Sequence, residues 1–169
     1  LIFDPVFLKK PLTEKKLGAL ARKVRYCPGV KSFFPRIDRF VQQQARLAGR
    51  KVKLEHYIIS SGLKTILDKM SLRKHFKAIY ACEYEYGKDK APKGVKTVVN
   101  DAMKTQCLFR ISKGKLGLHE DVNERVKKGA FRISFSQIIF IGDGETDIPS
   151  MAVIKKFGGY AIAVHAPGK

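Results

Sequence analysis

The chain has 169 residues, 44% of them hydrophobic, which suffices for one ordinary globular domain with a hydrophobic core. It carries 34 Lys and Arg against 15 Asp and Glu, so its formal net charge is +19 and nucleic acid belongs among its candidate partners. Its longest apolar runs are far shorter than the roughly 20 residues of a membrane-spanning helix. No signal peptide is recognisable, so we expect a cytoplasmic protein.

The basic residues and the cysteines each leave a plain alternative. Lysines and arginines occur as scattered pairs and not as one block, so a generally cationic, solvated surface explains them about as well as a nucleic-acid site does. Cys27, Cys82 and Cys107 are widely spaced, without a CxxC pair or a histidine at ligand spacing. We interpret them as reduced thiols, because neither a disulfide framework nor a zinc site fits this spacing.

The first half of the chain predicts two helices and then a strand. Apolar residues recur at helical spacing over 13–25, with Thr13 as N-cap, and over 31–48. Residues 53–62 become apolar towards their end and stop at a tight Ser-Ser-Gly turn, after which helical spacing returns over 63–70. A strand, a turn and a helix in this order predict the first part of a right-handed crossover unit.

The middle of the chain predicts a hairpin followed by helices. Aromatic residues alternate with glutamates over 78–86, a turn follows, and 95–99 is again β-like. Residues 104–112 predict a short helix that ends near Gly114, and 119–128 predict a polar surface helix.

The last part of the chain predicts a buried strand from Ile138, a helix over 148–157 and a last buried strand over 160–164. Short apolar strands that alternate with helices predict an α/β fold whose parallel sheet is covered by helices on both faces. In such sheets the working site lies at the carboxyl ends of the strands, where Ser60 and Asp143 both fall.

The sequence Gly-Asp-Gly-Glu-Thr-Asp at 142–147 carries the sharpest functional signal. Asp143 leaves a strand between two glycines, which suits a hard cation such as Mg²⁺ that prefers oxygen ligands and keeps some waters. Asp147 could orient loop amides, favour the helix dipole or reach the metal through water, so both aspartates are metal candidates. The alternative is an ordinary Gly-Asp-Gly turn with an N-capping aspartate.

Two segments of the chain, including this one, resemble motifs of a known superfamily. Residues 139–147 resemble the fourth motif of the haloacid dehalogenase-like superfamily, whose acids bind Mg²⁺, and residues 58–63 resemble its second motif. The resemblance implies that the Ser60 hydroxyl forms a hydrogen bond with the transferring phosphoryl group. Ser61 and Gly62 would add backbone N–H donors at a helix start. The alternative for the two serines is that they only cap the helix.

Lys104 matches the third motif, a lysine at a helix start that in the family holds the phosphate and the charge of the nucleophile. In a chain this rich in lysine, a solvated surface residue is the alternative. From Pro11 through Val164 the chain resembles the phosphoserine-phosphatase-like branch of the superfamily, which implies a Rossmannoid parallel sheet with a β-hairpin insertion.

The first motif of the family, DxD with its aspartate nucleophile, is absent from the sequence. Leu1 to Val6 mimic its hydrophobic lead, but Val6 stands where the second aspartate would be, so we interpret Asp4 as loop or linker. We therefore expect an incomplete core domain over 26–169, preceded by a linker and remnant of a helical cap over 1–25. The nucleophile would lie outside this chain.

The sequence is compatible with two functions. The first is a Mg²⁺-dependent phosphohydrolase that acts through an aspartyl-phosphate on a phosphorylated small molecule, with this chain alone inactive. The alternative is a catalytically inactive module whose basic surface binds nucleic acid or a ribonucleoprotein partner.

Overall fold

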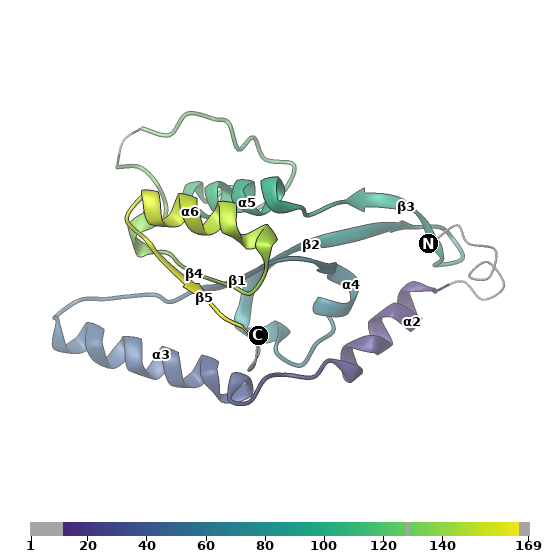
Figure 1. The fold of residues 1–169 in the computed structure, drawn as a ribbon, viewed down its shortest axis with the longest axis horizontal. Helices are drawn as coiled ribbons and strands as arrows, with labels where there is room; N and C mark the ends of the chain where they lie inside the picture. Colours follow the sequence, from purple (N-terminus) through teal and green to yellow (C-terminus); the bar gives the residue numbers. More distant parts are fainter. Residues whose placement is uncertain (1–11, 128, 166–169) are drawn as a thin grey trace. The chain divides into compact units, whose positions relative to one another are not determined.

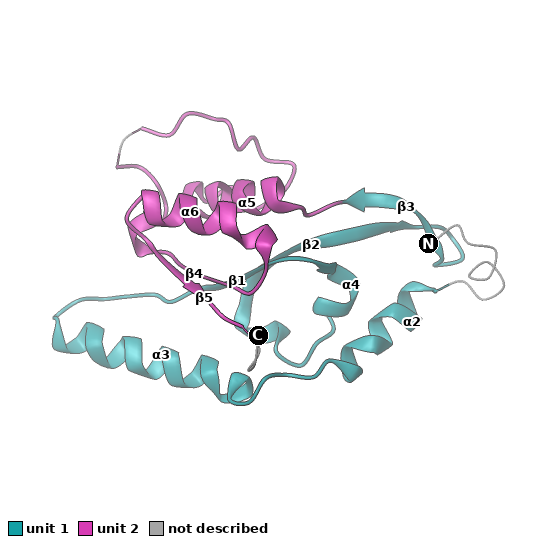
Figure 2. Ribbon diagram, viewed as in Figure 1, with its two compact units in different colours: residues 1–97 teal, residues 98–169 magenta. Residues whose placement is uncertain are grey.

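The computed structural model describes residues 12–127 and 129–165 (Figure 1). The chain forms two units, Leu1–Thr97 and Val98–Lys169 (Figure 2). Asp4 lies outside the described residues. No helix in the described part is long and apolar enough to cross a membrane.

The described part of unit 1 begins with helices that carry local start and stop signals. Helix α2 (Glu14–Ala19) continues into the 3-10 helix η1 (Leu20–Lys23), and the Thr13 hydroxyl accepts a hydrogen bond from the Lys16 amide, which confirms the predicted N-cap. Helix α3 (Val30–Leu47) ends before Gly49, whose φ of +64° suits a glycine.

The sheet of unit 1 has the order β1-β2-β3. Strand β1 (His56–Leu63) pairs in parallel with β2 (Phe76–Tyr86), and β2 pairs antiparallel with β3 (Pro92–Thr97). Helix α4 (Lys64–Leu67) and the 3-10 helix η2 (Arg73–His75) lie on the connection from β1 to β2. The predicted crossover and the predicted hairpin are therefore both present.

A small aromatic core holds α3 on this sheet. The Phe34 ring stacks on His75 with centroids 4.6 Å apart and meets the Phe76 ring edge-on at 5.1 Å. Phe34 packs in one buried cluster with Ile79 and Ala81 of β2. Burial of one such phenylalanine stabilises a fold by about 1.5–3 kcal/mol. Helical spacing also predicts burial of Phe33 and Phe40, but these side chains are 41% and 56% exposed.

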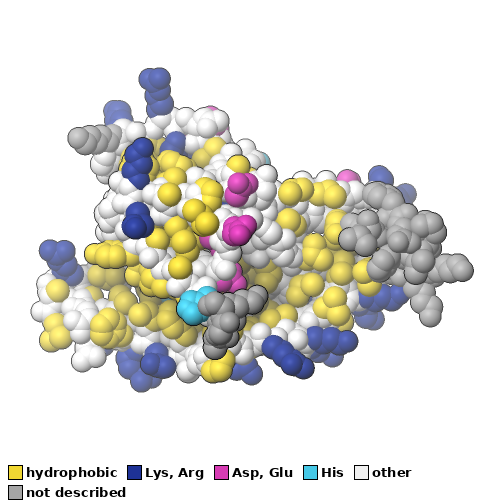
Figure 3. Space-filling view, viewed as in Figure 1, with side chains coloured by type: hydrophobic (Ala, Val, Ile, Leu, Met, Phe, Trp, Pro, Cys, Tyr) yellow, Lys and Arg dark blue, Asp and Glu magenta, His cyan; other side chains and the backbone are white. Residues whose placement is uncertain are grey.

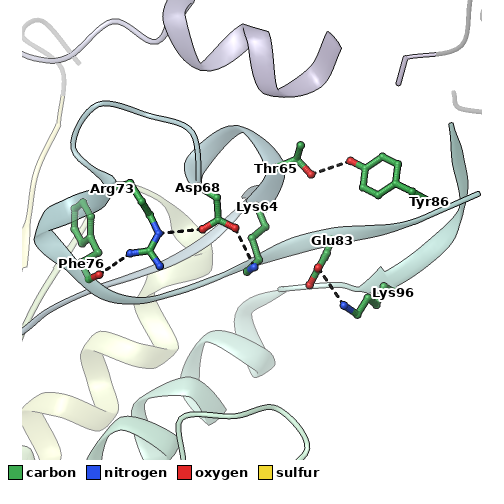
Figure 4. A network of polar contacts seen from close by, with 8 residues as sticks. All are labelled: Lys64, Thr65, Asp68, Arg73, Phe76, Glu83, Tyr86 and Lys96. Atoms are coloured by element: carbon green, nitrogen blue, oxygen red, sulfur yellow. Dashed lines mark hydrogen bonds and ion pairs between the residues drawn. The ribbon is translucent and has the colours of Figure 1, made fainter. Parts of the chain in front are cut away.

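A polar network fixes the segment after β1 (Figure 4). The Asp68 carboxylate accepts hydrogen bonds from Lys64 Nζ at 3.0 Å and from Arg73 Nε at 3.1 Å. Arg73 Nη1 donates in turn to the carbonyl of Phe76 at 2.6 Å, where β2 begins. Because α4 has only four residues, these side chains and not helix propensity set its position.

Unit 2 contains a parallel strand pair and two longer helices. Its elements are α5 (Asp101–Lys113), η3 (Phe135–Gln137), β4 (Ile139–Gly142), η4 (Glu145–Asp147), α6 (Ile148–Lys156) and β5 (Tyr160–Ala163). Strands β4 and β5 pair in parallel in register from Ile139 with Tyr160 to Gly142 with Ala163. Helix α6 packs on both strands and α5 packs on α6, with Cys107, Leu108 and Ile154 fully buried among them.

The predicted helix over 119–128 is wrong for the residues that the structure describes, because 119–127 form turns and irregular chain. Side chains of α5 take the carbonyls that a helix would use itself. Arg110 Nη1 donates to the carbonyls of Gly117 and Glu120 at 2.8 and 2.9 Å, and Lys113 Nζ donates to that of Val122 at 2.7 Å. These bonds satisfy the backbone without helical geometry.

The predicted burial of β4 and β5 is wrong in part. Ile139, Ile141 and Ile162 are 60%, 52% and 46% exposed, whereas Phe140 is buried. Successive side chains of a strand point to opposite faces, so the helix that covers one face of the pair leaves every second apolar residue outside. The α/β class is confirmed. Within the described residues, β1 pairs in parallel with β2 and β4 with β5, in small sheets of three and two strands.

Candidate phosphate and metal site

The turn after β4 presents Asp143 at the carboxyl end of the strand. Its side chain is exposed, whereas Gly142 just before it is buried. A Cβ at Gly142 would lie 2.7 Å from the Cβ and Oδ2 atoms of Asp147. Gly142 is therefore needed for Asp147 to fold back under the turn.

Asp147 is a buried carboxylate, 5% exposed, whose two oxygens are both used. Its Oδ2 accepts hydrogen bonds from the amides of Asp143 at 3.1 Å and Gly144 at 3.2 Å. Its Oδ1 accepts from Lys104 Nζ at 2.7 Å. The carboxylate thus orients the loop amides, which is one of the three roles that the sequence leaves open for it.

Lys104 comes from the first turn of α5, which Asn100 caps by accepting a hydrogen bond from the Met103 amide at 2.9 Å. It is 6% exposed, so it is not the solvated surface lysine of the alternative interpretation. Besides Asp147, its Nζ donates to the Thr146 hydroxyl at 2.8 Å. Two of the three N–H donors of the ammonium therefore have partners in the described chain, which leaves a third for a ligand oxygen.

Unit 2 accordingly brings together three of the residues singled out from the sequence: Lys104, Asp143 and Asp147. The buried lysine and the buried aspartate form an ion pair in which their charges cancel. The carboxylate of Asp143 is exposed, and the backbone amide of the same residue donates a hydrogen bond to Asp147. Figure 3 shows acidic side chains gathered over the segment between β4 and α6. Such an arrangement can receive a phosphate oxygen on the ammonium and a cation on the carboxylate.

Thr146 belongs to this cluster although no motif in the sequence points to it. Its hydroxyl meets an ammonium that is 42 positions away in the chain. The only signal in the sequence was its place beside Asp147, in a loop already assigned to the site.

The other predicted phosphate ligands lie in unit 1 and differ from expectation. Ser60, Ser61 and Gly62 do not form a tight turn but belong to the irregular end of β1, where Leu63 pairs with Cys82. The Ser60 hydroxyl accepts a hydrogen bond from the Gly62 amide at 3.0 Å. Helix α4 starts only at Lys64, with Leu63 at its N-cap position, so neither serine occupies that position.

A magnesium ion suits Asp143 better than Asp147. Among residues 12–127 and 129–165 there is no group of three or more His, Cys, Asp or Glu side chains that could enclose a metal ion. Mg²⁺ needs no such cage, because it keeps several waters and uses one or two carboxylates. Asp143 is exposed and fits this mode, whereas the oxygens of Asp147 already accept three hydrogen bonds, so its place among the metal ligands stays a prediction.

Comparison with known proteins bears on the fold. No protein-family model matches the chain. It is 27% identical over 157 residues to an uncharacterised protein of Borreliella burgdorferi, an alignment that spans 85% of this chain and 53% of that protein.

Among solved structures, a hydrolase of the HAD family from Salmonella enterica serovar Typhi matches with a TM-score of 0.57 at 18% identity, over 96% of this chain and 53% of that one. A probable phosphoserine phosphatase from Vibrio cholerae matches with a TM-score of 0.56 at 15% identity, over 91% of this chain and 38% of that one. The chain thus spans about half or less of the length of the proteins it matches. It has a haloacid dehalogenase-like (HAD-like) fold.

Proposed function

We propose that this chain supplies the phosphate-binding and metal-binding part of a Mg²⁺-dependent phosphomonoester hydrolase. The observation that carries the proposal is the buried Lys104 ammonium, held by Asp147 and Thr146 with one N–H donor left, beside the exposed Asp143 at the end of a parallel strand. A structural neighbour described as a probable phosphoserine phosphatase supports the substrate class, a phosphorylated small molecule.

Each residue of the cluster has a distinct task in this proposal. Lys104 donates its remaining N–H to a phosphoryl oxygen and balances its charge, and Asp143 binds the cation. Asp147 and Thr146 position Lys104 and the Asp143 loop. A bound Mg²⁺ would neutralise charge on the transferring phosphoryl group. The contribution of Ser60, Ser61 and Gly62 to phosphate binding rests on resemblance and stays a prediction.

Hydrolysis through an aspartyl-phosphate needs an aspartate nucleophile, and the 169 residues contain no DxD motif. We infer that the nucleophile comes from outside this chain and that the chain alone does not hydrolyse phosphate esters. We also propose that the protein acts in the cytoplasm.

The test is hydrolysis of p-nitrophenyl phosphate with Mg²⁺ by the whole gene product. We expect Asp143→Asn to lower kcat by about 100-fold or more, because the cation loses its carboxylate ligand. Glu145→Gln is the matched control, since it removes an equal charge from the same exposed loop and should leave kcat near that of the unsubstituted protein.

A second readout separates metal binding from activity. Mg²⁺ should raise the Tm of the unsubstituted protein and of Glu145→Gln but not that of Asp143→Asn. Hydrolysis that persists in EDTA, or that Asp143→Asn leaves unchanged, would contradict the proposal.

A catalytically inactive module that binds nucleic acid is the second candidate, and the net charge of +19 favours it. It predicts no hydrolysis by the whole gene product, together with RNA binding whose affinity falls steeply with salt. RNA affinity that stays constant with salt would exclude it.

A further inference from the structure

A cavity of about 690 Å³ opens in unit 1, between η1 with the chain that leads from it into α3 and the chain that follows α4. Its wall contains Arg22, Arg25, Tyr26, Lys31, Lys69 and Ser71. Figure 3 shows Lys and Arg side chains along α2 and the segment that leads to α3. None of these residues belongs to the candidate phosphate and metal site.

The charge of this wall has one sign. Four of its residues are cations, and no Asp or Glu of the described residues lines the cavity. Within 12–127 and 129–165, none of the four forms an ion pair with a carboxylate. Other lysines of unit 1 do so, as Lys77 does with Glu55 at 2.6 Å. Cations that converge without a counter-charge repel one another, and a bound anion would relieve that repulsion.

Two contacts order part of the wall of this cavity. The hydroxyls of Tyr26 and Ser71 are hydrogen-bonded at 3.1 Å, which ties the segment before α3 to the chain after α4. Lys31 Nζ lies 5.9 Å from the centroid of the Tyr26 ring, within reach of a cation–π interaction.

Gly18 explains how Lys69 reaches the cavity. A Cβ at this buried position of α2 would lie 2.5 Å from Lys69 Cδ and 2.8 Å from its Nζ. Glycine inside a helix is destabilising relative to alanine, and here the missing side chain makes room for the lysine. The helix surface is therefore shaped around a cation.

We propose that this cavity binds a small anion that carries two or more phosphate groups. A guanidinium group can bind two phosphate oxygens at once, and an ammonium group adds a point charge. Two arginines and two lysines therefore suit a ligand with several phosphate groups better than a ligand with a single carboxylate. Its volume lies within the range of small-molecule sites.

Titration calorimetry of the whole chain with tripolyphosphate at about 150 mM NaCl tests the proposal, because weak unspecific attraction is screened at that salt. We expect one saturable site, and the double variant Arg22→Gln/Arg25→Gln should weaken binding by about tenfold or more. The matched control is Arg36→Gln/Arg39→Gln, which removes the same charge from exposed positions of α3 and should bind as the unsubstituted chain does.

Lys69→Met is the second variant, since it keeps the alkyl contact with Gly18 and removes only the charge. It should also weaken tripolyphosphate binding. Equal losses in both arginine pairs, an unchanged affinity in Lys69→Met, or no binding at all would overturn the proposal. Single-stranded RNA that binds through Arg22 and Arg25 while tripolyphosphate does not would overturn it too and would identify nucleic acid as the ligand.

Discussion

Asp147 holds the candidate site together through one carboxylate. Two backbone amides donate to one of its oxygens and the Lys104 ammonium to the other, all in a buried place. Charge-assisted hydrogen bonds of this kind are short and strong, but each partner depends on the other for its counter-charge. The pair therefore predicts unequal effects of its two single substitutions.

We expect Asp147→Asn to lower the free energy of unfolding by about 3–5 kcal/mol, because it leaves the Lys104 ammonium buried without a counter-charge. Lys104→Met should lower it less, since the Asp147 carboxylate keeps its two amide donors. Urea unfolding at neutral pH measures both, and the double variant completes a cycle whose loss should be smaller than the sum. A strictly additive cycle would contradict direct coupling of the two charges.

His56 gives unit 1 a dependence on pH. Burial is the main cause that lowers the pKa of its imidazole, and nearby Asp38 opposes the shift. The Nε2 atom lies 3.8 Å from Asp38 Oδ1, which is beyond hydrogen-bond reach. The folded chain thus disfavours the protonated ring relative to the unfolded chain.

Because the pKa of His56 is lower in the folded chain, its contribution to stability is complete above the unfolded pKa, about 6.5, and is lost as pH falls through the folded value. We expect the free energy of unfolding to fall below pH 6.5 with a slope under about 1.4 kcal/mol per pH unit. Urea unfolding should show a flatter slope for His56→Gln and an unchanged one for His119→Gln, an exposed histidine. Equal slopes in all three proteins would refute this.

Among the elements, the turn from α6 to β5 has the tightest packing around a glycine. A Cβ at Gly159 would lie 2.8 Å from the carbonyl oxygen of Ile138 and closer still to that of Phe135. Both are backbone atoms, so no side chain can move aside. The Tyr160 amide donates to the Ile138 carbonyl at 3.0 Å next to this point, where β5 joins β4.

We expect Gly159→Ala to lower the free energy of unfolding by more than about 2 kcal/mol, because the strand pair must separate to admit the methyl group. Gly94→Ala in β3 is the control, since its nearest atom would lie at 3.8 Å, an ordinary contact. Thermal unfolding compares the two variants. Similar Tm values would show that the turn can relax.

At the scale of the whole molecule, charge dominates. With a net charge of +19 on 169 residues, the Lys and Arg side chains of the folded chain repel one another on balance. Added salt screens that repulsion. We expect the Tm to rise by about 3–5 °C between about 20 mM and 300 mM NaCl. The control is sucrose added at constant low salt, because sucrose stabilises folded proteins without screening their charges. A Tm that falls with NaCl would mean that attractive ion pairs outweigh the repulsion.

Local signals in the sequence determined most elements. Thr13 marks a helix start, the alternation over 78–86 predicts the hairpin, and short apolar strands between helices predict parallel pairing. Asp143 could also be selected as a candidate ligand from the sequence, because the two glycines that mark it are its neighbours in the chain. Each of these signals lies within a few residues of what it predicts.

Only the tertiary structure decided what distant residues do to one another. Arg110 and Lys113 keep 119–127 from forming a helix by taking its carbonyls, and the end of β1 extends through Ser60 to Leu63 because β2 lies beside it. Lys104 and Asp147 stand 43 positions apart, so no local pattern shows that they pair. The sequence thus determined which chemical groups are present, and packing decided which of them come into contact. The physical reason is that a buried charge is costly unless it is paired, and its partner can lie far away in the chain.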